Sequence, residues 1–351
     1  MGEPGEEHQH QARLTSMTRI TLTEIKEVAR AALISSGTSS ANAESVAESI
    51  CAAEACGIAS HGLLRVPIYC AHARSRKVDG FARPVLDNIE GGVAQIDARN
   101  GFAHPAIELA LEELVNLCHR QGVALACIRN SYNSGVMGHH VEHLASRGFI
   151  ALGFSNAPAT IAPWGGRQPV FGTNPIAFAA PRRGREAIVV DQAASVVARG
   201  EVLLRAQKGE AIPDTWGLDS DGVPCTDPLA VLRGGSMAPS GAHKGVALAL
   251  IVEILSAVLV GPKLSFDAGS LTEDDSREAG LGQMFIAIEP SRLSADYEQR
   301  IERLAMIVES QHPARLPGSL RQMRREEAAL SGVEVSELLL TRIRDIALRT
   351  P

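Results

Sequence analysis

The chain has 351 residues, of which 45% are hydrophobic and 21% charged, enough for a large core and two or more domains. Its net charge of −6 argues against a general nucleic-acid-binding protein, which normally carries a basic patch. The six cysteines lack the close spacing of a zinc site or disulfide framework. Reduced thiols in a cytoplasmic protein are therefore expected.

The N-terminal part of the chain is predicted to be helical after a disordered extension, residues 1–18, which lacks the apolar segment of a signal peptide. Thr21-x-x-Glu24 is a capping box and predicts a helix to about Ser35. Two more helices are expected, one from about Ser40 to Ala55 and one from near Ser60 to about Arg74.

The middle of the chain alternates between strand-like and helix-like patterns. Strands are expected at Val93–Asp97, Val123–Ile128, Ile150–Phe154, Ile188–Asp191 and Met284–Glu289. Helices are expected at Pro105–Arg120 and Met137–Ser146, between Asp191 and about Lys208, and from near His243. Residues 155–175 are rich in Asn, Pro and Gly, and such a long irregular segment inside a compact domain is usually functional.

Helices return from about Ala295, apart from a break at His312–Ser319. The longest apolar run, Val246 to Val260, contains a glutamate and is too short to span a membrane, so no membrane contact is expected. Because helices flank a central α/β region, the prediction is an α/β protein of two domains. Residues 19–90 and 310–351 would form the helical domain, and residues 91–309 the α/β domain.

The segment Ser60-His61-Gly62-x-x-Arg65 carries the first candidate chemistry. If it opens a helix, His61 and Arg65 are four residues apart and share a face, and Tyr69 continues that face. An imidazole that moves a proton, one turn from a guanidinium that binds a carboxylate, suits a 2-oxo or 2-hydroxy acid site. The alternative is a helix start capped by Ser60, with an incidental His–Arg pair.

Two glycine-containing turns are candidates for binding a cofactor. The turn Gly172-Thr173-Asn174 exposes backbone N–H groups of the kind that hold phosphate or amide groups, although it could be purely structural. Lys244 stands near a helix N-terminus, where a cation is unfavourable unless an anion binds there too. The alternative is an exposed lysine.

Three other sequence patterns bear on catalysis, metal binding and cofactor binding. Asp191 ends an apolar strand and could orient a histidine, or it could cap the next helix. His139 and His143 are one helical turn apart, but the Glu base and third ligand of HExxH zinc sites are not evident, so no metal is predicted. No GxGxxG follows a strand, so a nicotinamide would bind on a fold other than the Rossmann fold.

Ten segments in fixed order resemble the type-2 malate/L-lactate dehydrogenase family over residues 20–345. They are GIASHGLLRVPIY, GFAHPAIELALE, IRNSYNSGVMGHHVEHLA, SNAPATIAPWGG, FGTNPIAFAAPR, VVDQAASVVARGEVLLRAQKGEAIPDTW, DGVPCTDP, GAHKGVALALIVEIL, GQMFIAIEP and RLPG. The resemblance implies a homodimer with a non-Rossmann, mixed-sheet nicotinamide-binding domain. It also implies an oxidoreductase that uses NAD or NADP.

The implied reaction moves a hydride between the nicotinamide and the carbon next to a carboxylate, as in malate or lactate. The resemblance makes His61 the proton donor, oriented by Ser60 and Asp191. The implied substrate contacts are Arg65, Tyr69 and Asn133. The implied cofactor contacts are Ser134, Gly135, Gly172, Thr173, Asn174, His243, Lys244, Arg315, Pro317 and Gly318, within a stretch that continues to Arg321.

Two departures from the family leave alternatives open. Many members place a histidine where this chain has Asn133, which cannot act as a base, and some read PGE where this chain has Pro317-Gly318-Ser319. The alternatives are a reductase of the cyclic imines Δ1-pyrroline-2-carboxylate and Δ1-piperideine-2-carboxylate, or a non-catalytic relative that binds NADH. The choice between NAD and NADP also stays open.

Overall fold

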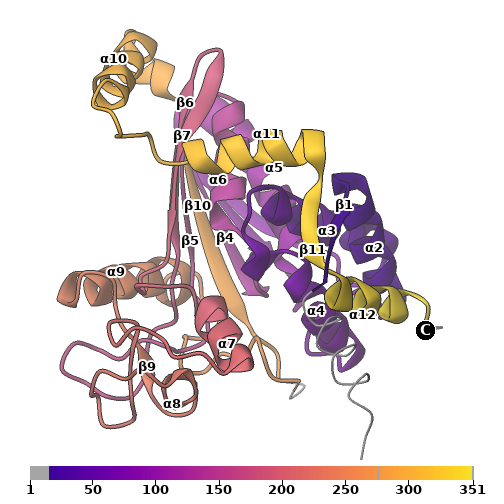
Figure 1. Ribbon diagram of the computed structural model, residues 1–351. Coiled ribbons are helices and arrows are strands. Elements are labelled where there is room, and N and C mark those ends of the chain that lie inside the picture. Colours follow the sequence, from indigo (N-terminus) through magenta and orange to yellow (C-terminus); the bar gives the residue numbers. More distant parts are fainter. Residues whose placement is uncertain (1–15, 275–276, 350–351) are drawn as a thin grey trace, which may run out of the picture. The chain divides into compact units, whose positions relative to one another are not determined.

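The computed structural model describes residues 16–274 and 277–349, which divide into two compact units (Figure 1). Unit 1 contains the described residues up to Phe81 and those from Ser319 onward, and unit 2 is Ala82–Gly318. Most of the expected N-terminal extension, residues 1–15, lies outside the described residues, whereas Met17 and Thr18 belong to a strand.

Unit 1 is a helical unit with one small ribbon. Its helices are α2 (Leu22–Ile34), α3 (Ser40–Ala55), α4 (Val66–Arg74), α11 (Ser319–Ser331) and α12 (Glu337–Ala347). The strands β1 (Met17–Ile20) and β11 (Val333–Ser336) pair antiparallel, so the two ends of the described chain share one ribbon. The predicted capping box is present: Glu24 N–H donates to Thr21 Oγ1 over 3.2 Å, and Thr21 N–H donates to Glu24 Oε2 over 2.7 Å.

The expected continuous helix from Ser60 to Arg74 is wrong in its first part. Two short 3₁₀ turns, η1 (Ala59–His61) and η2 (Leu63–Arg65), precede α4. Gly62 separates them with φ −92° and ψ −139°, an extended conformation that no helix contains. His61 and Arg65 therefore stand on consecutive turns rather than on one helix face.

Unit 2 is built on a seven-stranded mixed sheet in the order β2-β3-β4-β10-β5-β6-β7. The strands are β2 (Val85–Glu90), β3 (Val93–Asp97), β4 (Val123–Ser131), β5 (Ile150–Ser155), β6 (Ile176–Arg182), β7 (Arg185–Gln192) and β10 (Leu281–Ile288). Only β3 and β4 pair in parallel. The sheet confirms the predicted fold class, although β2 and β6 were not anticipated.

The two faces of this sheet are covered differently. Helices α5 (Ala103–Gln121) and α6 (Met137–Ser146) pack on one face against small side chains such as Ala126, Ala151 and Ala177. On the other face, α9 (His243–Glu253) and the π turn η3 (Ile254–Val258) form a smaller cluster around Phe154, Val252 and Met284. In Figure 1, α5 and α6 lie on one side of the strands and α9 on the other.

The remaining elements of unit 2 are short helices and strands. They are α7 (Arg199–Lys208), β8 (Gly217–Leu218), α8 (Pro228–Leu232), β9 (Ser236–Met237), η4 (Pro290–Arg292) and α10 (Tyr297–Glu309). The helix predicted to follow Asp191 begins only at Arg199, whereas the predicted break between α10 and α11 is present. Within residues 16–274 and 277–349, no helix combines the length and apolar character needed to cross a membrane.

Candidate active site

The two 3₁₀ turns of unit 1 are held by one buried carboxylate, that of Glu54 on α3. Glu54 Oε1 accepts a 2.6 Å hydrogen bond from the backbone N–H of Leu63. A Cβ on Gly62 would come within 2.1 Å of the same oxygen, so only glycine lets the chain pass this close. Burial raises the pKa of Glu54, and the Leu63 hydrogen bond opposes that rise. This close approach is the physical reason for the break in the expected helix.

His61 stands at the end of the first turn, half-buried and next to a hydroxyl. Its Nδ1 lies 3.0 Å from Ser60 Oγ, which leaves Nε2 as the nitrogen available to a ligand. Burial lowers the pKa of His61 to about 3, and the positive charges of Arg65 and Arg321 lower it further. The imidazole of the free enzyme is therefore neutral at physiological pH.

Arg65 remains close to His61 even though the two do not share a helix face. Its Nε donates to the carbonyl oxygen of Ser60 over 2.8 Å, which folds the guanidinium back toward the first turn. Among the described residues Arg65 forms no ion pair, so its terminal N–H groups can bind a carboxylate. A single Arg–carboxylate pair of this kind is commonly bidentate.

Tyr69 lies one turn further along, on α4, and is only 2% exposed. Burial raises the pKa of Tyr69 to about 12, so the hydroxyl keeps its proton. The ring belongs to the core of unit 1. Tyr69 therefore supports the turn and offers little surface that a substrate could contact.

In unit 2, the loop before α6 is fixed by its own side chains. Asn133 Oδ1 accepts from Gly135 N–H over 3.0 Å, and Gly135 has a positive φ of 67°. His140 Nε2 donates to the Ser134 carbonyl over 2.8 Å. Burial lowers the pKa of His140, while the Ser134 hydrogen bond and the negative charge of Asp191 raise it. Asp191 is thus near the 133–140 segment.

The turn at residues 172–174 is tightly packed. A Cβ on Gly172 would meet the Ala157 carbonyl oxygen at 2.2 Å. Asn174 is fully buried, and its amide donates to Ala249 O at 3.0 Å and to Glu253 Oε2 at 2.8 Å. The Asn174 side chain therefore ties the turn to α9, and Thr173 is the half-exposed member of the turn.

The N-terminus of α9 fits an anionic group such as a cofactor phosphate. Gly241 and Ala242 both have positive φ, 65° and 57°, which bends the chain sharply into the helix. Lys244 is exposed there, and the His243 ring packs against Trp164 with centroids 5.9 Å apart. The backbone N–H groups of Lys244 and Gly245 are already bonded to the carbonyls of Gly241 and Ala242, so the exposed ammonium of Lys244 is the donor here that is suited to a phosphate.

Residues 315–318 dock onto β7 of the sheet. Val189 N–H donates to the Pro317 carbonyl over 3.2 Å. Gly318 has φ +92°, and a Cβ there would lie 3.2 Å from Val189. Arg315 is exposed, so its guanidinium can reach an anionic ligand.

A metal site is not assembled in the described parts of the chain. No three or more His, Cys, Asp or Glu side chains come together there in a way that would hold a metal ion. His139 and His143 on α6 thus lack a third ligand within residues 16–274 and 277–349.

Reasoning from the sequence alone missed two buried groups at these sites. The first is Glu54, the only charged residue in the segment AAEACG at the end of α3. A single charge among small residues is the sequence feature that could have identified it. The second is His140, which connects the 133–135 loop to Asp191 and was not predicted as part of a site.

The mixed sheet of unit 2 and the named relatives together make the chain a nicotinamide-dependent oxidoreductase outside the Rossmann class. The chain belongs to the malate/L-lactate dehydrogenase family, whose sequence pattern matches residues 20–344. The predictions of this family, of a dehydrogenase or reductase and of a nicotinamide cofactor are confirmed.

Named relatives cover nearly the whole chain. The chain is 42% identical over 328 residues, 93% of this chain and 98% of the relative, to (2R)-3-sulfolactate dehydrogenase (NADP(+)) of Chromohalobacter salexigens. It is 36% identical over 329 residues, 93% and 96% of the two chains, to the Δ1-pyrroline-2-carboxylate/Δ1-piperideine-2-carboxylate reductase of Pseudomonas syringae pv. tomato. The crystal structure of Δ1-piperideine-2-carboxylate reductase from that organism superposes with a TM-score of 0.88 at 35% identity, covering 94% of this chain and 99% of that one.

Proposed function

We propose that the chain transfers a hydride between NADP and the carbon next to the carboxylate of a small 2-hydroxy or 2-oxo acid. The observation that carries the proposal is His61 beside Arg65, with the guanidinium anchored on the Ser60 carbonyl. When bound, the nicotinamide supplies or accepts the hydride. The choice of NADP rests on the 42% identical relative, which is named for NADP(+).

Unit 1 would supply the proton chemistry. Arg65 binds the substrate carboxylate, and the negative charge of that carboxylate offsets one of the cations that hold the His61 pKa down. His61 then exchanges a proton with the substrate oxygen through Nε2, because Nδ1 faces Ser60 Oγ. In the oxidation direction the neutral imidazole accepts the hydroxyl proton directly. General acid–base catalysis of this kind contributes about 10²–10⁴-fold.

Unit 2 would hold the cofactor. The exposed Lys244 at the start of α9 is suited to a phosphate, and Arg315 to a second anionic group. Gly172, Asn174, Pro317 and Gly318 would shape the walls through their tight backbone packing rather than through side-chain contacts. The remaining proposed cofactor contacts are Ser134, Gly135, Thr173 and His243. Asn133 would contact the substrate. The predicted role of Asp191 in orienting His61 stays a prediction, and within unit 2 its charge acts on His140.

The substrate would carry a second anionic group, as 3-sulfolactate and malate do. Two guanidiniums, Arg65 and Arg321, act electrostatically on the same imidazole, and two cations suit two anionic groups. The second candidate is reduction of Δ1-pyrroline-2-carboxylate or Δ1-piperideine-2-carboxylate, which the 36% identical relative is named for. That substrate has one carboxylate and a C=N bond.

A substrate panel tests the proposal. Purified enzyme is assayed at 340 nm with 3-sulfopyruvate, oxaloacetate, pyruvate and Δ1-pyrroline-2-carboxylate, each with NADPH and NADH. We expect turnover of the dianionic oxo acids with NADPH. The Arg321→Ala variant should lower the turnover of these dianionic substrates and leave that of pyruvate unchanged. Turnover of the cyclic imine alone would favour the second candidate. NADPH binding without turnover of any compound would indicate a non-catalytic relative and contradict the proposal.

We also propose that the enzyme works in the cytoplasm as a homodimer. Its six cysteines are all free thiols, as expected in a reducing compartment. Support for the dimer comes from the sheet face opposite α5 and α6, where one row of half-buried apolar side chains crosses five strands. In register order, the row is Leu125, Ile286, Leu152, Phe178 and Val190.

The outer face of α9 and η3 continues this apolar surface. Ile286 and Leu152 of the row pack against the same cluster as Val252 of α9. Every exposed side chain between Gly245 and Val260 is apolar. The large ones, 45–65% exposed, are Leu250, Ile251, Ile254, Val258 and Leu259. An uncharged apolar face is self-complementary across a two-fold axis and is typical of homodimer interfaces, so a second copy is the proposed occupant.

A further inference from the structure

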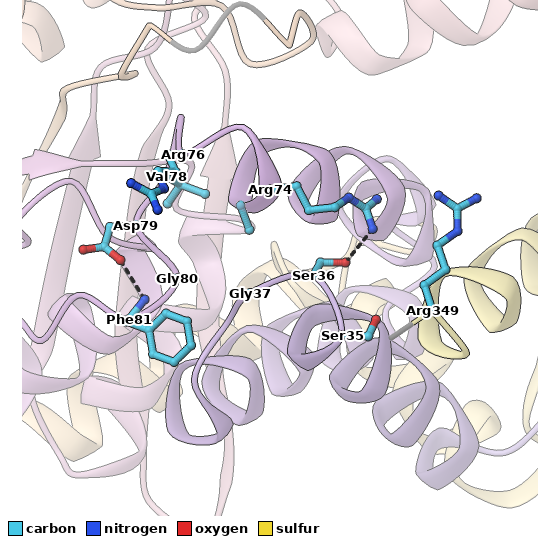
Figure 2. A pocket seen from close by; sticks show the side chains of 11 residues that line it. Ser35, Ser36, Gly37, Arg74, Arg76, Val78, Asp79, Gly80, Phe81 and Arg349 are labelled. Atoms are coloured by element: carbon cyan, nitrogen blue, oxygen red, sulfur yellow. Dashed lines mark hydrogen bonds between the residues drawn. The ribbon is translucent and has the colours of Figure 1, made fainter. Parts of the chain in front are cut away.

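Unit 1 contains a cavity of about 620 Å³ that none of the residues of the proposed reaction lines (Figure 2). It lies where three helices end: Ser35 follows α2, Arg74 is the last residue of α4, and Arg349 follows α12. Pockets that bind small molecules typically measure about 300–1,000 Å³. The cavity is therefore large enough for a ligand with a body as well as a charged group.

The charge of the cavity is strongly positive. Three arginines line it, Arg74, Arg76 and Arg349, against one aspartate, Asp79. The Asp79 carboxylate accepts from the Phe81 backbone N–H over 2.9 Å. Within residues 16–274 and 277–349, none of the three guanidiniums forms an ion pair. The charged side chains of the lining therefore sum to a formal charge of +2.

Among the described residues, the guanidiniums of these arginines donate no hydrogen bonds to the last carbonyls of the helices. Cations are favoured at helix C-termini because the last carbonyls carry partial negative charge. Here Ser35 Oγ already donates to the carbonyls of Ala32 at 3.0 Å and Ile346 at 2.8 Å, at the ends of α2 and α12. Arg74 Nη1 donates instead to the side-chain oxygen Ser36 Oγ, over 3.1 Å. The guanidinium is thus positioned by a side chain rather than used as a cap.

The lining has two chemically different parts. In Figure 2, Arg74 and Arg349 lie at the end of the cavity near Ser36, and Phe81 lies at the opposite end. Ala73 and Val78 contribute apolar wall, and the Phe81 side chain, on a residue 65% exposed, offers an aromatic surface. Paired guanidiniums suit a phosphate group, and an exposed ring suits a flat apolar body.

We propose that this cavity is a binding site for an organic phosphate monoester, with the dianionic phosphate between Arg74 and Arg349 and a flat apolar body against Phe81. The two negative charges of the phosphate match the formal charge of +2 that the side chains of the lining carry. The site is separate from His61 and Arg65, and it binds its ligand whether or not the proposed reaction takes place.

Isothermal titration of the full-length protein with phenyl phosphate tests the site. We expect Arg74→Ala and Arg349→Ala each to weaken binding at least tenfold. Arg342→Ala removes an equally exposed arginine from α12 and should change the affinity less than twofold, as should Arg65→Ala. Phe81→Ala should weaken the binding of phenyl phosphate but leave the affinity for inorganic phosphate unchanged. Thermal melts of each variant verify folding.

Three results would overturn the proposal. The first is no heat of binding at millimolar phenyl phosphate. The second is an equal loss in Arg342→Ala, which would indicate a general effect of charge. The third is a loss confined to Arg65→Ala, which would move the ligand to the proposed catalytic turn.

Discussion

At the scale of single residues, the environment of His61 decides its chemistry. A histidine whose pKa lies at about 3 is a base in the free enzyme and becomes a proton donor only after an anion arrives beside it. Arg65 has both roles in this scheme, because it binds the carboxylate and its charge depresses the imidazole pKa. In the proposed reaction, substrate binding and proton transfer would thereby be coupled through one guanidinium.

Arg65→Lys tests the geometry of this guanidinium. Lysine keeps the charge but loses the planar fork and the Nε contact to the Ser60 carbonyl. We expect KM for the oxo acid to rise about tenfold, the scale of one lost bidentate contact, with a smaller change in kcat. Steady-state kinetics with Arg342→Lys as the control measure this, and an unchanged KM would argue against Arg65 as the clamp.

His104 on α5 gives a prediction about stability. Burial, followed by the charges of His140 and His139, lowers the pKa of His104 to about 3, below its ordinary value of 6.5. The unfolded state therefore binds a proton that the folded state does not, and stability falls as the pH drops from 6.5 toward 3. This one group accounts for about 1.4 kcal/mol per pH unit in that window.

His104→Leu should flatten the dependence of the free energy of unfolding on pH below 6.5. Urea denaturation at several pH values measures the slope. His119→Leu is the matched control, because the His119 side chain is 58% exposed. Equal slopes in wild type and His104→Leu would show that His104 titrates normally.

At the scale of elements, helices with strong local signals were predicted closely. The helix predicted from about Ser40 to Ala55 is α3, and Thr21 caps α2 as expected. Where prediction failed, distant contacts override local pattern: Glu54 breaks the helix at Gly62. The edge strand β2 is mostly exposed and lacks apolar alternation, and β11 exists because it pairs with β1 at the other end of the chain.

The same limit applies to the site. The residue types and order of the His–Arg motif were visible in the sequence, but the bond from Arg65 to the Ser60 carbonyl was not. Asn174 was expected at the cofactor, and its burial against Glu253 became apparent only from the packing of α9. Its amide is better described as holding the turn.

Substitutions of Glu54 test whether the two 3₁₀ turns depend on its carboxylate. Glu54→Gln keeps the size and an oxygen acceptor for Leu63 N–H, so we expect nearly normal kcat. Glu54→Ala leaves that buried N–H unpaired and should lower stability by about 1–3 kcal/mol and kcat at least tenfold through misplacement of His61. Calorimetry and kinetics of both variants distinguish these effects. Normal kcat in Glu54→Ala would show that the turn does not need this carboxylate.

For the whole molecule, the proposed homodimer would form through the apolar sheet row and the outer face of α9. Ile251→Glu and Leu259→Glu place charges on side chains 51% and 65% exposed, so folding of the subunit should be unaffected. We expect light scattering to give twice the 37.2 kDa chain mass for wild type and the single-chain mass for the double variant. Leu293→Glu, at a side chain 74% exposed, is the control. A monomeric wild type would contradict the proposed dimer.

If His61 moves the substrate proton and the cofactor is held by other residues, removal of the imidazole should change turnover far more than NADPH affinity. NADPH affinity, from fluorescence enhancement, and kcat with the best substrate of the panel are measured for wild type and His61→Ala. We predict that kcat falls about 10²–10⁴-fold while NADPH affinity changes less than threefold. A His61→Ala enzyme that retains a kcat within threefold of wild type would contradict it.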